Sequence, residues 1–229
     1  MILIESKRKK LETVLAKFPN ARIVDITSKA TNALVKFSPF YPHGDIPIPF
    51  SEGKTAMSVE GIWQGLKVFS SHDIDEEMFN NDSMKNLKRT VKKFGKPLGH
   101  RKGVNGTELL SYLDARIEIY LPVYKWVLEN KLSDILIRLK EASKKENIVL
   151  LDYETNTNVL SFKKPLSHAY LVKAFVEGTY PDKLTIYEQQ ARETAGSAGV
   201  SQSQTAIKNW ASKPGTSELN NNNNQSTLF

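Results

Sequence analysis

Four side chains with different chemistry occur at helical spacing in the segment that begins near Ser58. Positions i, i+3, i+4 and i+7 carry Glu60, Trp63, Gln64 and Lys67. On a helix these positions share about a third of the circumference. An amine that loses its proton can attack a carbon atom, and a carboxylate on the same face can carry protons for it. An ordinary solvent-facing stripe, with the indole packed under a loop, would show the same spacing.

For such an attack the Lys67 amine must be neutral near pH 7. Because the free pKa of lysine is about 10.4, this requires burial of the amine or a neighbouring cation. A carboxylate close enough to pair with the ammonium would raise that pKa instead. We therefore expect Glu60 and Lys67 to be offset from each other rather than joined in a tight ion pair.

A loop that could carry substrate contacts precedes this helix. Its sequence, SPFYPHGDIPIPFSEGK, contains four prolines, which stiffen the backbone. Phe40 and Tyr41 could stack on a base together with Trp63, or could anchor the loop to the core. His43 and Gly44 stand at the bend, where the histidine could contact substrate or form only a local hydrogen bond.

Basic residues are concentrated in one segment of a chain with net charge +7. Between Asp82 and Glu108 there is no acidic residue. Such a segment could bind the phosphates of nucleic acid or a pyrophosphate, or could be a solvated face. The residues expected to contact nucleic acid, on a helix over 84–94, are Lys85, Lys88, Arg89, Lys92 and Lys93.

Three further candidates come from their places in the expected elements. Arg101 lies in the glycine-rich loop GKPLGHRKG and Arg116 near the start of a helix, and both could bind an anion. For Arg116 a buried ion pair with a nearby carboxylate is an equal alternative. Asp152 ends an apolar strand, where catalytic carboxylates often emerge, and Ser167 and His168 follow in places that suit capping of the next helix.

The periodicity of apolar residues and the positions of proline and glycine predict a mixture of helices and short strands. Helices are expected at about 5–18, from 58, at 84–94, at 107–130 with a break at Pro122, at 132–145, at 165–178 and at 184–194. Strands are expected at 21–27, 33–37 and 147–153. These elements predict a single, mostly helical α+β domain over residues 1–195. The Ser, Gln and Asn-rich segment 196–229 is expected to be disordered.

The composition excludes several classes of site. The chain has no cysteine, which excludes disulfides, thiolate catalysis and cysteine-ligated zinc. The four histidines lack metal-ligand spacing, so we expect neither a metal nor another cofactor. No apolar run is long enough to span a membrane, and the N-terminus is charged where a signal peptide is apolar. We therefore expect a cytoplasmic protein without a membrane partner.

The segments FSPFYPHGDIPIPF and SVEGIWQGLKVF together resemble the N-terminal signature of the NADAR (YbiA-like) superfamily. In that superfamily an FSNF-type segment precedes a helix with a Glu-x-x-x-Gln-x-x-Lys pattern. Later segments resemble a related branch, and the resemblance covers roughly residues 1–180. These later segments are KRTVKKFGKPLGHRKG, ARIEIYLPVYKWVLEN, LLDYETNTN and PLSHAYLVKAFVEG.

The resemblance implies a YbiA/NADAR-like domain that cleaves N-glycosidic bonds. Members act on ribosylated pyrimidine intermediates of the riboflavin pathway or remove ADP-ribose from modified guanine in nucleic acid. Phage-encoded relatives protect viral DNA from a host DNA ADP-ribosyltransferase toxin. The resemblance implies that Lys67 is the covalent amine and that Glu60 assists proton transfer. Asp152 is the nearest match to a C-terminal Asp-x-x-Trp-Gly element, and Gly61 stands where many relatives have histidine.

We therefore expect an N-glycosidase that removes ADP-ribose from guanine in nucleic acid, with DNA preferred over RNA, through a lysine Schiff base. It would counter a DNA ADP-ribosyltransferase toxin, in the host cytoplasm if the gene is carried by a phage. One alternative is an N-glycosidase acting on a small ribosylated metabolite. Another is a non-enzymatic, replication-associated protein that binds DNA, or binds a sliding clamp through its terminal QSTLF peptide, Gln225–Phe229.

Overall fold

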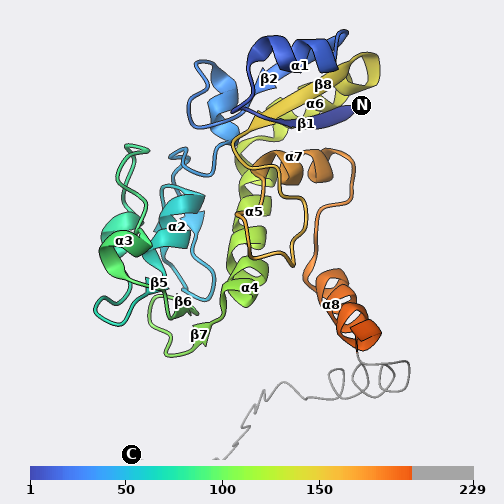
Figure 1. The fold of residues 1–229 in the computed structure, drawn as a ribbon. Helices are drawn as coiled ribbons and strands as arrows, with labels where there is room; N and C mark the ends of the chain where they lie inside the picture. Colours follow the sequence, from blue (N-terminus) through green and yellow to red (C-terminus); the bar gives the residue numbers. More distant parts are fainter. Residues whose placement is uncertain (198–229) are drawn as a thin grey trace, which may run out of the picture. The chain divides into compact units, whose positions relative to one another are not determined.

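A computed structural model describes residues 1–197 of the chain (Figure 1). Met1–Ile186 forms one compact unit of helices and short strands, and a second unit begins at Tyr187. The helix α8 spans Lys183–Ser197. The first unit has both helices and strands and confirms the expected α+β class. Among the described residues, no helix combines the length and the apolar character that crossing a membrane requires.

A three-stranded parallel sheet contains both the first strand of the chain and the last. Its strands are β1 (Ile2–Ser6), β8 (Asn147–Asp152) and β2 (Ala21–Asp25), in the order β1-β8-β2. The apolar sequence NIVLLD lies in the centre and is buried from Ile148 onward, as expected for a strand covered on both faces. The helices α6 (Ser133–Lys145) and α7 (His168–Val176) both contact β8 (Figure 1).

A long helix in three segments packs against both α6 and α7 through its last part. It consists of α4 (Tyr112–Ala115), a π-helical turn (Arg116–Tyr120) and α5 (Leu121–Lys131). The predicted break at Pro122 is wrong, because the helix continues through the proline. The π-helical turn directly before α5 changes the hydrogen-bond pattern at the point where proline lacks an N–H.

The middle of the chain forms two small antiparallel sheets around a short helix. One sheet pairs β3 (Ile46–Pro47) with β4 (Thr55–Ala56). The other has the order β5-β6-β7, with bounds Lys67–Val68, Gly99–Arg101 and Leu109–Leu110. The helix α2 (Val59–Gly65) begins as expected, since the Ser58 hydroxyl accepts a hydrogen bond from the Gly61 N–H at 2.9 Å. All seven of its residues are buried.

The N-terminal segment differs from the helix expected at 5–18. Ile2–Ser6 is strand β1, and only Leu11–Lys17 is helical, as α1. Because β1 pairs with β8 at the other end of the domain, the local spacing of apolar residues cannot indicate this strand. Residues Ala33–Phe37 form a 3-10 helix instead of the expected strand, and the Asn32 side chain caps its first turn.

The basic helix expected at 84–94 is reduced to a single turn, α3 (Val91–Phe94). Met84 and Asn86 have φ angles of 57° and 58°, in the left-handed region that interrupts a right-handed helix. The following segment, expected as a loop, contains strand β6. The helices at 132–145 and 165–178 are confirmed, although α7 begins only after its cap, Ser167. The Gln225–Phe229 peptide lies outside the described residues.

Candidate functional site

The side-chain amide of Gln64 connects Glu60 to Lys67. The helix α2 ends at Gly65, so Lys67 approaches the other two residues from the start of β5 and not from the helix. Gln64 Nε2 donates to Glu60 Oε1 at 2.6 Å, and Lys67 Nζ donates to Gln64 Oε1 at 2.8 Å. The carboxylate and the amine are therefore offset, as the sequence predicts, although the four side chains do not share one helical face.

Burial shifts the titration of Glu60 and Lys67 toward their neutral forms. Glu60 is 8% exposed, and burial raises its pKa, although the Gln64 hydrogen bond and the charges of Lys67 and Lys88 act in the opposite direction. Burial lowers the pKa of Lys67, and the charges of Arg89 and Lys88 lower it further against the effect of Glu60. Burial thus moves the acid and the amine toward their uncharged forms.

Close packing around α2 depends on two glycines. A Cβ atom on Gly61 would lie 2.5 Å from the Met78 carbonyl oxygen, and one on Gly65 would lie 2.3 Å from the Phe79 ring. Both distances are shorter than atoms can approach. A histidine at position 61, as in many NADAR proteins, is therefore incompatible with the 3-10 turn Glu76–Met78 in its observed place.

Trp63 lies in an aromatic cluster with a histidine that the sequence pattern does not indicate. The Trp63 and His100 ring centroids are 3.9 Å apart, and His100 pairs directly with Lys67 across β5 and β6. Within the described part of the chain, neither ring nitrogen of His100 has a hydrogen-bond partner. Burial and the charge of Lys67 lower the His100 pKa to about 3, although the nearby Trp63 main chain acts in the opposite direction, so the imidazole is neutral at pH 7.

Arg89 lies inside the domain and not on the expected nucleic-acid face, which corrects that prediction. It is 5% exposed, and its guanidinium donates to the main-chain carbonyls of Gln64, Lys67 and Asp73. Its own main-chain N–H donates to Gln64 Oε1 at 3.1 Å. Arg89 therefore orients the amide that connects Glu60 and Lys67. The sequence around Arg89 has the pattern of a solvent-exposed basic helix face. Only the contacts of Arg89 with residues far away along the chain reveal this role.

The four lysines of the expected nucleic-acid face are exposed and form no ion pair with the side chains that the structure describes, those of residues 1–192. They are Lys85, Lys88, Lys92 and Lys93. The Lys88 ammonium lies 5.5 Å from the centroid of the Phe40 ring, and its charge affects the pKa of both Glu60 and Lys67. The basic surface therefore extends to the edge of the site.

The proline-rich loop lies against the start of α2. The Glu60 N–H donates to the Pro39 carbonyl at 2.9 Å, which holds the half-buried Phe40 and Tyr41 near the helix. His43 uses its Nε2 atom in a contact with the Lys36 carbonyl at 2.9 Å, and its ring lies beside that of Tyr41. Gly44 has a φ of +73°, a backbone conformation that favours glycine. The structure thus gives His43 and Gly44 roles in shaping the bend.

The two arginines proposed as anion ligands have structural partners. Arg116 is 2% exposed, and its guanidinium donates to the carbonyls of Val159, Ser161 and Lys164 and to the Tyr112 hydroxyl. An anion cannot reach it, so this prediction is wrong, and the guanidinium instead holds the segment that follows β8. Arg101 is less buried and pairs with Asp73 and the Gly106 carbonyl.

Asp152 emerges at the end of β8 as expected, but its partners come from α7. Its Oδ2 atom is 3.0 Å from His168 Nδ1 and accepts hydrogen bonds from the Ser167 hydroxyl and the Ala169 N–H. His168 Nε2 is 2.9 Å from the Ile26 carbonyl. Both ring nitrogens thus face acceptors, an arrangement that favours an imidazolium. Burial opposes this charge, yet Asp152 raises the His168 pKa overall. A catalytic role for Asp152 remains a prediction.

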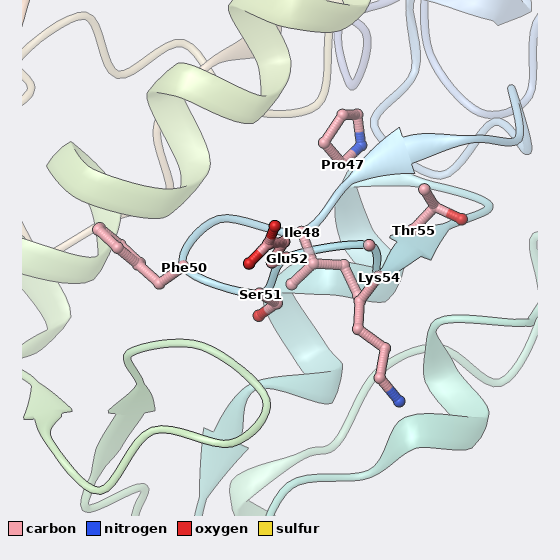
Figure 2. A pocket seen from close by; sticks show the side chains of 8 residues that line it. Pro47, Ile48, Phe50, Ser51, Glu52, Lys54 and Thr55 are labelled. Carbon is pink, nitrogen blue, oxygen red and sulfur yellow. The ribbon is translucent and has the colours of Figure 1, made fainter. Parts of the chain in front are cut away.

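Two surface hollows lie away from the Gln64 amide. Figure 2 shows the first, of about 500 Å³, around the β3–β4 hairpin, with Phe50 and Lys54 pointing in different directions. The second, of about 310 Å³, lies between Phe50, Leu121 and Tyr180. Glu60, Gln64 and Lys67 line neither of them. Of these three residues only Lys67 is partly exposed, so a substrate would approach the set from the lysine.

One comparison with known proteins identifies a family. A family model described as "Family of unknown function (DUF6939)" matches residues 6–172. The matched range includes α2, β5, Arg89, His100 and Asp152 and ends within α7. No curated protein matches the chain.

Proposed function

The chain belongs to the DUF6939 family, and we propose that it is an N-glycosidase in which Lys67 Nζ attacks the sugar carbon of its substrate. The observation that carries this proposal is the amide of Gln64, which holds Glu60 and Lys67 close together without an ion pair between them. Burial of both groups favours the neutral amine and the neutral acid that the reaction needs. The resemblance to the NADAR superfamily supports the same two roles.

The proposed reaction uses each group in turn. The neutral Lys67 amine forms a bond to the sugar C1 as the bond from C1 to the base nitrogen breaks. The Glu60 carboxyl gives its proton to the departing base, and the resulting carboxylate takes a proton from the new ammonium adduct. The nitrogen lone pair then displaces the ring oxygen from C1, Glu60 returns its proton to that oxygen as it becomes a hydroxyl, and a protonated Schiff base remains. Addition of water releases the sugar and restores the amine.

ADP-ribosylated guanine in DNA is the substrate that we propose. The lysines Lys85, Lys88, Lys92 and Lys93 offer an exposed positive surface for a phosphate backbone, and Lys88 brings that surface to the edge of the site. The Trp63 ring lies 5.9 Å from the amine, and Phe40, beside Lys88, and Tyr41 offer further rings for a base. Removal of ADP-ribose from DNA would counter a toxin that attaches it, and a phage gene product would do so in the host cytoplasm.

One observation favours the alternative of a small ribosylated metabolite. Because Arg89 is buried, the basic surface is smaller than the sequence implies, and a substrate with few phosphates would need fewer contacts. Under this alternative, neutralising the exposed lysines leaves activity unchanged, and DNA does not compete with the substrate. The clamp-binding alternative depends on the peptide Gln225–Phe229. Its test is to delete this peptide and to measure binding to a sliding clamp.

The decisive experiment traps the covalent intermediate. Wild-type protein is incubated with guanine-ADP-ribosylated DNA, borohydride is added, and peptide mass spectrometry locates the adduct. We expect ADP-ribose release and an adduct on Lys67, and expect Lys67→Ala to lose both while its circular dichroism is unchanged. Lys96→Ala, which removes an exposed lysine from the same segment, serves as the matched control. Full activity of Lys67→Ala would refute the mechanism.

A further inference from the structure

The hydroxyl group of Tyr120 differs from those of the neighbouring tyrosines in its hydrogen bonding. Among the side chains that the structure describes, those of residues 1–192, this hydroxyl forms no hydrogen bond. The neighbouring tyrosines differ in this respect. Tyr124 donates to the Phe37 carbonyl at 2.6 Å, Tyr180 donates to the Leu121 carbonyl at 2.9 Å, and Tyr112 accepts from Arg116. Tyr120 is half-buried, and its hydroxyl is not among the buried polar atoms that lack a partner, so this oxygen is open to a ligand from solvent.

The Tyr120 ring is part of the aromatic cluster beside the reactive groups. It meets the Trp63 ring edge to face, with centroids 5.6 Å apart, and stacks on Tyr124 at 6.2 Å. Trp63 comes one residue before Gln64, and its ring centroid lies 5.9 Å from Lys67 Nζ. The phenol therefore borders the same cluster as the amine, although it comes from a different part of the chain.

The backbone at Tyr120 is unusual. Tyr120 is the last residue of the π-helical turn Arg116–Tyr120, and single π-helical turns inside α-helices often occur at functional sites. The turn changes the direction in which its side chains leave the helix, relative to a regular α-helix. Arg116, the first residue of the turn, donates hydrogen bonds to main-chain carbonyl groups. The first side chain of the turn is therefore held in place, whereas the last one, Tyr120, has a hydroxyl without a hydrogen-bond partner among the described side chains.

The hydroxyl remains a hydrogen-bond donor at all physiological pH values. Burial raises the pKa of Tyr120 well above its usual range, and the negative charges of Glu60 and Asp152 raise it further. Because both carboxylates act on the phenol, Tyr120 lies within electrostatic reach of the proposed acid and of the carboxylate at the end of β8. A neutral phenol there can donate to an acceptor but does not serve as a base.

We propose that the Tyr120 hydroxyl is a substrate-binding group, which donates a hydrogen bond to an oxygen atom of the sugar that Lys67 attacks. This role depends on the proposed function, because it requires a sugar at Lys67. A sugar carries several acceptor oxygens close to C1, whereas the Tyr124 hydroxyl, on the ring that stacks on Tyr120, is already engaged with the Phe37 carbonyl. Binding of the sugar would therefore give the hydroxyl the partner that it lacks in the free protein.

Phenylalanine at position 120 tests the proposal because it removes only the hydroxyl. With guanine-ADP-ribosylated DNA as substrate, we expect Tyr120→Phe to lower kcat/KM by about tenfold or more, the effect of one hydrogen bond to a polar transition state. Its urea midpoint should match that of the wild type, because no hydrogen bond of the free protein is removed. The matched control, Tyr180→Phe, should show the reverse, with unchanged kcat/KM and a lower urea midpoint.

The two ways in which this experiment can fail are distinguishable. If wild-type protein releases ADP-ribose and Tyr120→Phe does so within twofold of the same rate, the role of Tyr120 is refuted and the proposed function stands. A lowered urea midpoint of Tyr120→Phe equal to that of Tyr180→Phe would also refute it, since the hydroxyl would then be structural. If wild-type protein releases no ADP-ribose, the proposed function fails and the role of Tyr120 fails with it.

Discussion

Arg89 and Gln64 are joined through both main chain and side chain. The Arg89 N–H donates to Gln64 Oε1 at 3.1 Å, and the Arg89 guanidinium donates to the Gln64 carbonyl at 3.4 Å. Because Lys67 Nζ donates to the same Oε1 atom, two donors fix which way the amide faces. The nitrogen of that amide must then point to Glu60. A residue that the sequence places on a nucleic-acid surface thus sets the geometry of the reactive pair.

Gln64→Leu should destabilise the protein, because it removes an amide with partners on both sides. Glu60 would lose a donor, and Lys67 and the Arg89 N–H would lose their acceptor, in a buried position. We expect the free energy of unfolding to fall by about 1–3 kcal/mol, measured by urea denaturation. Asn130→Leu, which removes an exposed side-chain bond to Trp126, should change it by less than about 0.5 kcal/mol. Equal effects would contradict the bridging role.

The pair of Asp152 and His168 predicts how stability depends on pH. The His168 pKa is raised in the folded protein, so the folded state holds this proton more tightly than the unfolded state does. The resulting stabilisation is complete below the unfolded pKa of about 6.5 and is lost as pH rises through the folded value. We expect the free energy of unfolding to fall with rising pH above about 6.5, measured by urea denaturation between pH 6 and 9. In His168→Gln this fall should disappear; an unchanged pH profile would show that other groups cause it.

His100 should not titrate in the physiological range. Burial and the charge of Lys67 lower its pKa to about 3, so the imidazole NMR signals should stay constant between pH 5 and 8. His100→Phe replaces two unpartnered nitrogens with an apolar ring of similar shape against Trp63. Such a change is neutral or stabilising when no hydrogen bond is removed. A titration near pH 6.5, or a loss of more than about 2 kcal/mol in His100→Phe, would contradict the buried, unpartnered state.

The sequence predicts the local parts of this site and misses the non-local ones. Glu60, Gln64 and Lys67 could be grouped because all three lie close together along the chain behind a recognisable cap, Ser58, although Lys67 belongs to β5 and not to the helix. His100 could not be placed, since only its pairing with Lys67 across β5 and β6 brings it there. For the fold, the apolar run of β8 was recognisable by itself. Its partner β1 was not, because a parallel pair depends on residues far apart along the chain.

The exposed lysines Lys88, Lys92 and Lys93 provide the last prediction, which concerns DNA. Each lysine that binds a phosphate releases counterions, so affinity depends steeply on salt. Reversal of all three charges to glutamate should weaken binding of double-stranded DNA. It should also reduce the slope of log affinity against log salt by about 0.9 for each phosphate that is no longer neutralised, measured by fluorescence anisotropy across a salt series.

A matched control separates a specific surface from the net charge. Reversal of Lys125, Lys140 and Lys144, which are exposed on α5 and α6, changes the net charge by the same amount at a different place. If the surface beside Phe40 and Lys67 binds DNA, only the first set should lower the salt slope. Equal reductions for the two sets would mean that DNA responds to overall charge alone. Unchanged release of ADP-ribose from DNA by the first set would show that these lysines do not bind the substrate.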